Sequence, residues 1–74
     1  MRFSLVVPGR VDIEVFDVSG RRVRRLLDAE RAAGPGEVTW DGSDGSGARV
    51  GAGVYLLRMV GPGIRDTRRV VRLE

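Results

Sequence analysis

The sequence predicts an all-β fold, a small antiparallel β-sandwich of about six or seven strands. Short apolar segments recur at roughly ten-residue spacing, and clusters of Gly, Pro, Ser and Asp, which favour turns, separate them. No segment carries a helical apolar period over enough residues to form a stable helix. This arrangement is typical of an immunoglobulin-like sandwich, although an SH3-like or OB-like barrel can have the same number of strands.

The clearest strand lies near the start of the chain, where apolar and charged residues alternate. Val11, Ile13 and Val15 are separated by Asp12 and Glu14. A period of two places the apolar side chains on one face of a strand and the charged side chains on the other. We therefore expect this strand to bury one face and to expose the other to water.

The remaining strands are expected between turn signals. The segments are Phe3–Val7, Arg21–Leu27, Glu37–Trp40, Val54–Val60 and Ile64–Leu73. The first three strands along the chain are expected to form a meander, and a Gly-Pro-Gly turn joins the last two. Asp28–Ala33 is expected to be a loop, because the Gly-Pro-Gly segment after it ends any helical turn.

The alternation also predicts which side chains form the core. The expected core residues are Leu5, Val11, Ile13, Val15, Val23, Trp40, Tyr55, Leu57 and Val71. Two of them carry a polar group on an aromatic ring, so the Trp40 N–H and the Tyr55 O–H should each find a hydrogen-bond partner.

The composition argues against catalysis. The chain of 74 residues contains no Cys and no His, so it lacks disulfides, thiolate nucleophiles and the commonest general base. Its length allows a single domain, residues 1–74, with little room for a deep cleft. We therefore expect no enzyme activity, no catalytic residue, no cofactor and no small-molecule substrate.

The Gly-rich loop Asp41–Gly47 carries two carboxylates without the spacing of a calcium loop. Gly45 occupies a ligand position of such a loop, and Ala52 stands where a closing Glu is required. Asp side chains in turns commonly accept hydrogen bonds from backbone N–H groups two residues further on. We expect a structural turn and no metal site, with weak ion binding as the alternative.

All thirteen basic residues are Arg, and they exceed the ten acidic residues by three. Two segments are rich in Arg, one with Arg21, Arg22, Arg24 and Arg25 and the other with Arg65, Arg68, Arg69 and Arg72. An anion or nucleic-acid binder is one interpretation, but strand neighbours point to opposite faces and the aromatic residues are scattered. The expected role is a solvated face that protects a sheet edge from aggregation.

Four ordered segments resemble a known family, the immunoglobulin-like domain of the flagellar hook-capping protein FlgD and the related type A C-terminal sorting domains of the type IX secretion system. Val11–Val23 is similar to a strand-turn-strand pattern ending V-Y-D-x-x-G-R-x-V, with Phe16 in place of the usual Tyr. Gly34–Gly47 resembles the W-D-G-x-D-x-x-G segment, Gly53–Tyr55 the s-G-x-Y segment, and Thr67–Leu73 the closing basic strand. The signature residues are Asp17, Gly20, Trp40, Asp41, Gly42, Asp44, Gly47, Gly53 and Tyr55.

The resemblance to sorting domains implies a non-catalytic C-terminal module that the outer-membrane secretion machinery recognises on its cargo. The partner is then a protein, and the surface expected to bind it is the last strand, with Arg68, Arg69, Val70, Val71, Arg72 and Leu73. In the hook-capping protein, the same fold implies a structural assembly domain, which is the alternative.

The resemblance further implies that the chain is the C-terminal part of a longer precursor that is secreted or displayed at the cell surface. Met1–Pro8 contains a mostly apolar stretch of five residues, Phe3–Val7, which is too short for the core of a signal peptide. The sequence contains no run of about twenty apolar residues that could span a membrane. We therefore expect any export address to lie outside these residues.

Overall fold

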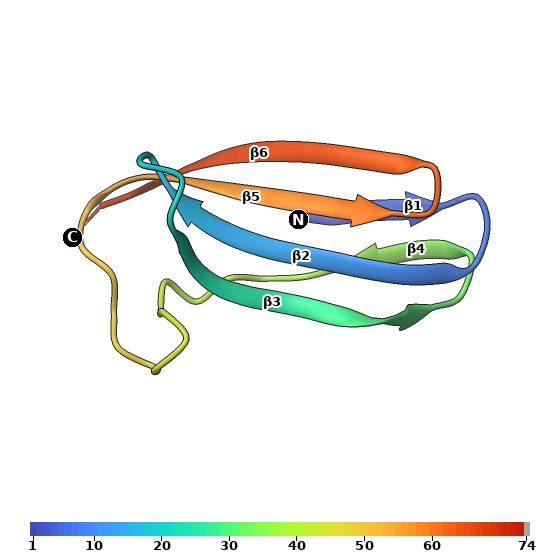
Figure 1. The fold of residues 1–74 in the computed structure, drawn as a ribbon, viewed down its shortest axis with the longest axis horizontal. Helices are drawn as coiled ribbons and strands as arrows, with labels where there is room; N and C mark the ends of the chain where they lie inside the picture. The colour runs from blue at the N-terminus through green and yellow to red at the C-terminus, as the bar shows by residue number, and fades with distance from the viewer. Residues whose placement is uncertain (74) are drawn as a thin grey trace.

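The computed structural model describes residues 1–73, and within this range the chain forms six β-strands and no helix. The strands, labelled in Figure 1, are β1 (Arg2–Leu5), β2 (Gly9–Asp17), β3 (Arg22–Arg31), β4 (Gly34–Glu37), β5 (Gly53–Gly61) and β6 (Ile64–Arg72). The predicted all-β fold class is confirmed. No helix in the described residues is long and apolar enough to cross a membrane.

The strands form two antiparallel sheets. The larger sheet has the order β3-β2-β5-β6, so the β2–β3 and β5–β6 hairpins meet along β2 and β5. The smaller sheet consists of β1 and β4. Because β3 and β6 each pair on one side only, the larger sheet has open edges, and the fold is a sandwich rather than a closed barrel.

The core lies between the two sheets. Val11, Ile13 and Val15 have no solvent exposure, as their alternation with charged residues predicts. From β1, Leu5 packs against Val11 and Ile13, and Met59 joins the same cluster from β5. Apolar burial between the sheets is therefore the main stabilising contribution in this small domain.

The strand β3 is longer than the sequence predicts. Asp28–Arg31, expected to lie in a loop, continues the strand, and Arg31 pairs with Gly9 at the far end of β2. A cross-strand ion pair accompanies this extension, with Arg10 Nη2 at 2.7 Å from Asp28 Oδ1. The long partner strand holds this polar segment extended because it supplies the backbone hydrogen bonds.

The predicted meander of the first three strands is wrong for β1. This strand pairs with β4 in the smaller sheet. β4 covers Gly34–Glu37 instead of the expected Glu37–Trp40, so the Gly-Pro-Gly segment is itself the strand. Its register places Gly36 opposite Phe3, and a Cβ at Gly36 would lie 2.4 Å from Phe3 Cζ. The missing side chain lets the aromatic ring lie directly on the strand, which is why Gly is suited to this position.

The predicted core is wrong at Val71, which is 58% exposed. Val71 pairs with Val54, and both lie on the face of the larger sheet that points away from the core. The alternation along β6 therefore runs in the opposite phase to the one predicted. Val23, Trp40 and Tyr55, also expected in the core, are only half-buried at the loop end of the sandwich.

We expect Ile13→Ala to lower the free energy of unfolding by about 2–5 kcal/mol, because it leaves a cavity at a fully buried position. Val18→Ala is the matched control, since Val18 is 75% exposed and should change stability by less than about 0.5 kcal/mol. Urea denaturation of both variants measures the difference. Equal stability of the two would contradict the assignment of the core.

Candidate functional site

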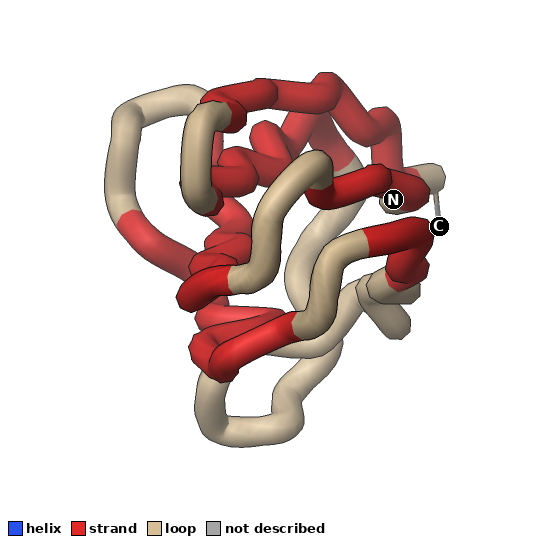
Figure 2. Tube along the Cα trace, turned by 90° about the vertical axis from the view of Figure 1, so that its right-hand side faces the viewer, coloured by secondary structure: helices blue, strands red, loops and turns tan. Residues whose placement is uncertain are grey.

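The signature residues gather at one end of the sandwich. Asp17 ends β2, Gly20 lies in the β2–β3 turn, and Gly53 and Tyr55 lie at the start of β5. The other members lie in the β4–β5 loop, which extends below the strands in Figures 1 and 2; they are Trp40, Asp41, Gly42, Asp44 and Gly47. The predicted set therefore forms one spatial cluster, although no single segment contains it.

The two aromatic signature residues pack against each other. The ring centroids of Trp40 and Tyr55 lie 5.2 Å apart with an interplanar angle of 62°, an edge-to-face contact. The Trp40 indole N–H donates to the Ser43 carbonyl at 2.8 Å, and the Tyr55 hydroxyl donates to the Gly51 carbonyl at 2.8 Å. The expectation that each ring finds a polar partner is confirmed, and both bonds fix the loop.

The β2–β3 turn is built on the Asp17 carboxylate. Its Oδ1 accepts hydrogen bonds from the Ser19 N–H at 3.0 Å, the Ser19 hydroxyl at 2.6 Å and the Arg21 N–H at 3.0 Å. Gly20 has a φ of 88°, which lies in the left-handed region that favours glycine. The signature Asp and Gly are therefore explained by the geometry of this turn.

The β4–β5 loop contains a second turn of the same design. Asp44 Oδ1 accepts hydrogen bonds from the Ser46 N–H at 2.9 Å, the Ser46 hydroxyl at 2.6 Å and the Ala48 N–H at 3.1 Å. Gly47 has a φ of 90°. The two turns share an Asp-x-Ser-Gly spacing, at residues 17–20 and 44–47, and this repeat is the sequence signal from which the second turn is predictable.

Asp41 makes a related turn that anchors the loop to β3. Its Oδ1 accepts from the Ser43 N–H at 3.0 Å and the Ser43 hydroxyl at 2.6 Å. The Arg24 guanidinium hydrogen-bonds the Ser43 hydroxyl oxygen and lies 3.5 Å from Asp41 Oδ1. Ser43 is buried, so these bonds satisfy a polar group removed from water.

These hydrogen bonds lower the pKa of all three carboxyls from the ordinary value of 3.8. The hydroxyls of Ser19, Ser43 and Ser46 are the largest cause of the lowered pKa of Asp17, Asp41 and Asp44 respectively, and backbone N–H groups add to it. In each carboxylate, Oδ1 is thus engaged in holding a turn. The described residues contain no group of three or more metal-ligating side chains.

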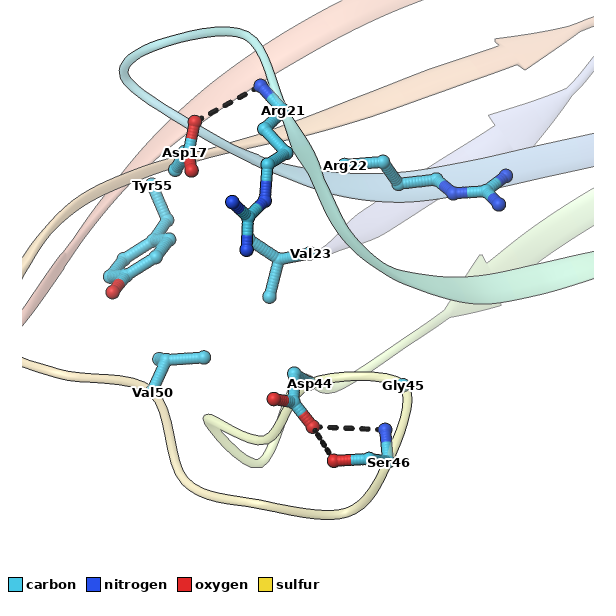
Figure 3. Close-up of a pocket in the computed structure, with 9 residues that line it drawn as sticks. All are labelled: Asp17, Arg21, Arg22, Val23, Asp44, Gly45, Ser46, Val50 and Tyr55. Atoms are coloured by element: carbon cyan, nitrogen blue, oxygen red, sulfur yellow. Dashed lines mark hydrogen bonds between the residues drawn. The ribbon is translucent and has the colours of Figure 1, made fainter.

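An open pocket of about 380 Å³ lies between the two Asp-x-Ser-Gly turns (Figure 3). Asp17 and Arg21 line it from the β2–β3 turn, and Asp44 lines it from the loop. Tyr55 and Val50 close one side. The Ser46 hydroxyl at its rim donates a hydrogen bond to Asp44 Oδ1 and is thereby engaged in holding the turn.

Arg72, at the end of β6, holds the edge strand against this loop. Its guanidinium carbon lies 5.5 Å from the centroid of the Trp40 ring. The guanidinium also occupies the space beside Gly42, where a Cβ would lie 2.2 Å from Arg72 Cζ. The signature residues Gly42 and Trp40 therefore form the surface against which the Arg72 side chain of the last strand packs.

The residues predicted to bind a partner lie on β6 and just beyond it. Arg69, Val71 and Leu73 are exposed and alternate along the chain, whereas Val70 and Arg72 are half-buried. Arg68 Nε lies 2.9 Å from Asp66 Oδ2 in an ion pair. The six predicted residues therefore divide between two faces of the strand, and one contiguous surface cannot include all of them.

Arginines of the first Arg-rich segment form ion pairs with a carboxylate of the neighbouring strand β2. On the face of the larger sheet that points away from the core, which we call the outer face, Glu14 Oε2 lies 3.1 Å from Arg22 Nη1 and 3.6 Å from Arg25 Nη2. Arg58 Nη2 approaches Glu14 Oε1 at 3.6 Å and its guanidinium covers the Phe16 ring. Neighbouring carboxylates pair with Arg22, Arg25 and Arg58, which disfavours the anion and nucleic-acid interpretation for these arginines.

The fold and the loop cluster define an immunoglobulin-like β-sandwich domain. The sequence model of the FlgD Ig-like domain matches residues 7–62, which is most of the chain, and the chain belongs to that family. The matched segment ends before β6. No curated protein and no solved structure matches the chain.

The lowered carboxyl pKa values predict a loss of stability in acid. Each pKa lies below 3.8 in the folded state and returns toward it on unfolding, so the stabilisation is present above that pH and is lost as pH falls through the folded pKa. We expect Asp17→Asn/Asp44→Asn to lose less stability than the wild type between about pH 6 and pH 2. Urea titrations at each pH measure the free energy of unfolding of both proteins. An identical loss of this free energy in the variant and the wild type would contradict the prediction.

The contact between Arg72 and Trp40 predicts energetic coupling. We expect a double-mutant cycle of Arg72→Ala and Trp40→Leu to give a coupling free energy of about 1 kcal/mol in denaturant titrations. Arg69→Ala is the matched control, because Arg69 is exposed on the same strand and should show no coupling to Trp40. Additive effects of the Arg72 and Trp40 variants would argue against this contact.

Proposed function

We propose that this domain is a non-catalytic structural module that assembles with protein partners. Membership of the FlgD Ig-like family supports an assembly role. The loop cluster supports the non-catalytic part of the proposal, because its carboxylates and hydroxyls are engaged in holding turns. The cluster thus stabilises the ends of the strands, and the sheet provides the surface for partners.

The observation that carries the proposal is the unpaired edge of β6. This strand pairs with β5 on one side and with no other described strand. It displays exposed residues of both apolar and basic character, including Val71 and Arg69. Open edges of this kind accept an extended segment of another protein through backbone hydrogen bonds.

A second candidate is the sorting role that the resemblance implies. In that role the last strand is the element that a type IX-type secretion machinery reads, and the domain ends a longer precursor that is secreted or held at the cell surface. The accessible edge formed by β6 supports this candidate, since Arg69, Val71 and Leu73 lie within reach of a receptor.

Site-specific photocrosslinking in the native host tests the assembly role. We expect a photoreactive residue at Arg69 to give a discrete crosslink to one protein, because β6 is the expected contact strand. Arg31 is the matched control, since it is an exposed arginine on the opposite edge strand β3. Absence of any crosslink at Arg69, or identical products from both positions, would refute the proposed contact.

Export of a reporter fusion distinguishes the sorting role from the assembly role. We expect a folded reporter with this domain at its C-terminus to reach the surface of a host that has the secretion machinery only if the domain is a sorting signal. Deletion of Arg68–Glu74 should then abolish export. Export that survives this deletion would exclude β6 as the sorting signal.

A further inference from the structure

The outer face is not uniform across the sheet. Over β5 and β6 it carries an apolar and basic surface that we call the β5–β6 patch, composed of Val54, Leu56, Arg65, Thr67, Arg69 and Val71. The register shows that these residues share a face, since Val54 pairs with Val71 and Leu56 with Arg69. The buried Leu57 and Met59 alternate with them and point into the core.

The charge on this patch is unbalanced within the described residues. Over β2 and β3, the outer face is a network of ion pairs in which the Glu14 side chain is only 13% exposed between three arginines. Arg65 and Arg69 are exposed, and neither has an acidic side chain of the described residues within ion-pair distance. The patch therefore presents two cations whose counter-charge must come from solvent or from a partner.

The backbone of β6 offers hydrogen-bonding groups beside these side chains. The two-residue turn Pro62–Gly63 closes on the paired residues Gly61 and Ile64. Because a tight hairpin bonds its closing pair to each other, alternate residues from Arg65 onward direct their N–H and C=O groups away from β5. The residues with free backbone groups are thus the ones whose side chains form the patch.

We propose that the β5–β6 patch binds an acidic, extended segment of a protein partner, which adds to β6 as an antiparallel strand. The inference rests on the proposed function and specifies the partner's chemistry. The larger sheet is antiparallel throughout, and an antiparallel ladder is the more stable pairing per residue. Carboxylates on the added strand supply the counter-charge that Arg65 and Arg69 lack.

A second copy of this chain is a poor occupant of the same edge. Antiparallel pairing of two β6 strands would bring Arg65 and Arg69 of one copy close to the same arginines of the other. Like charges directly opposite each other destabilise a sheet. The arginines therefore act against self-association while they favour an acidic strand.

The register predicts the pattern of the partner segment. An antiparallel strand meets Val71 first, then Arg69, Thr67 and Arg65, all on one face. Its facing residues are therefore apolar, acidic, polar and acidic at alternate positions, with the two acidic residues four apart. Four residues of a strand span about 13 Å, which is the separation expected between Arg65 and Arg69 along β6.

Peptide binding tests the proposal directly. The probe is a synthetic peptide of about ten residues with Val, Glu, Thr and Glu at alternate positions. The control peptide has the same composition with its Glu residues three apart, which places them on opposite faces of a strand. We expect calorimetry to show binding of the probe alone, and NMR amide shifts to map it to Arg65–Val71.

Charge reversal provides the matched variants. We expect Arg69→Glu to weaken binding of the probe by about tenfold or more, whereas Arg31→Glu on the opposite edge leaves it unchanged within about twofold. A probe with Lys in place of Glu should bind the Arg65→Glu/Arg69→Glu variant and not the wild type. If the probe pairs with β6 through its backbone, N-methylation of those probe residues whose N–H groups point toward β6 should abolish binding.

Four results would overturn the proposal. Equal binding of the probe and control peptides would mean that charge alone attracts them, without a strand register. Unchanged binding after N-methylation would exclude strand addition. Failure of the probe to bind, while the Arg69 crosslink to a protein persists, would reject the acidic strand and leave the assembly role intact. Dimerisation through β6 in sedimentation experiments would instead identify a second copy as the occupant.

Discussion

The structure depends on the alternation of side chains along β2. This strand lies inside the larger sheet between β3 and β5. The residues of β2 that point into the core therefore determine which residues of both neighbouring strands do so. Its buried residues form the centre of the core, and its charged residues, above all Glu14, organise the arginines of the outer face. A one-residue slip would exchange these two environments, burying carboxylates and exposing the core residues.

The loop end shows how a small domain can be ordered without helices or disulfides. Three Asp side chains each replace missing backbone hydrogen bonds in a turn, and a Ser hydroxyl two residues later completes each arrangement. Trp40 then links the loop to Tyr55 on β5 and to Arg72 on β6. Most of the family signature thus describes how the loop is attached to the sheet, and the proposed partner surface lies on the neighbouring strand β6.

Local patterns predicted much of this fold, and long-range contacts account for what they missed. The period of two identified β2 and its buried face, and the turn signals located the β5–β6 hairpin. The pairing of β1 with β4 was not predictable, because it depends on Phe3 covering Gly36 more than thirty residues away. Val71 was assigned to the core from the apolar alternation along its segment, yet the pairing register with β5 places it on the outer face. Within the site, the sequence identified the signature residues. Strand alternation also predicted that neighbouring arginines point to opposite faces, yet Arg68–Leu73 was expected to form one partner surface, and the structure divides it between two faces.

The two-stranded sheet has a consequence for how the domain opens. β1 and β4 make their ladder with each other, and what joins β1 to the larger sheet is the packing of Leu5 and Phe3 onto the core. Pairing of β1 with β4 also brings together two segments about thirty residues apart, so forming it costs the conformational entropy of closing a long loop. β1 can therefore detach without breaking a ladder hydrogen bond of the four-stranded sheet, and amide exchange in β1 should report local opening rather than global unfolding.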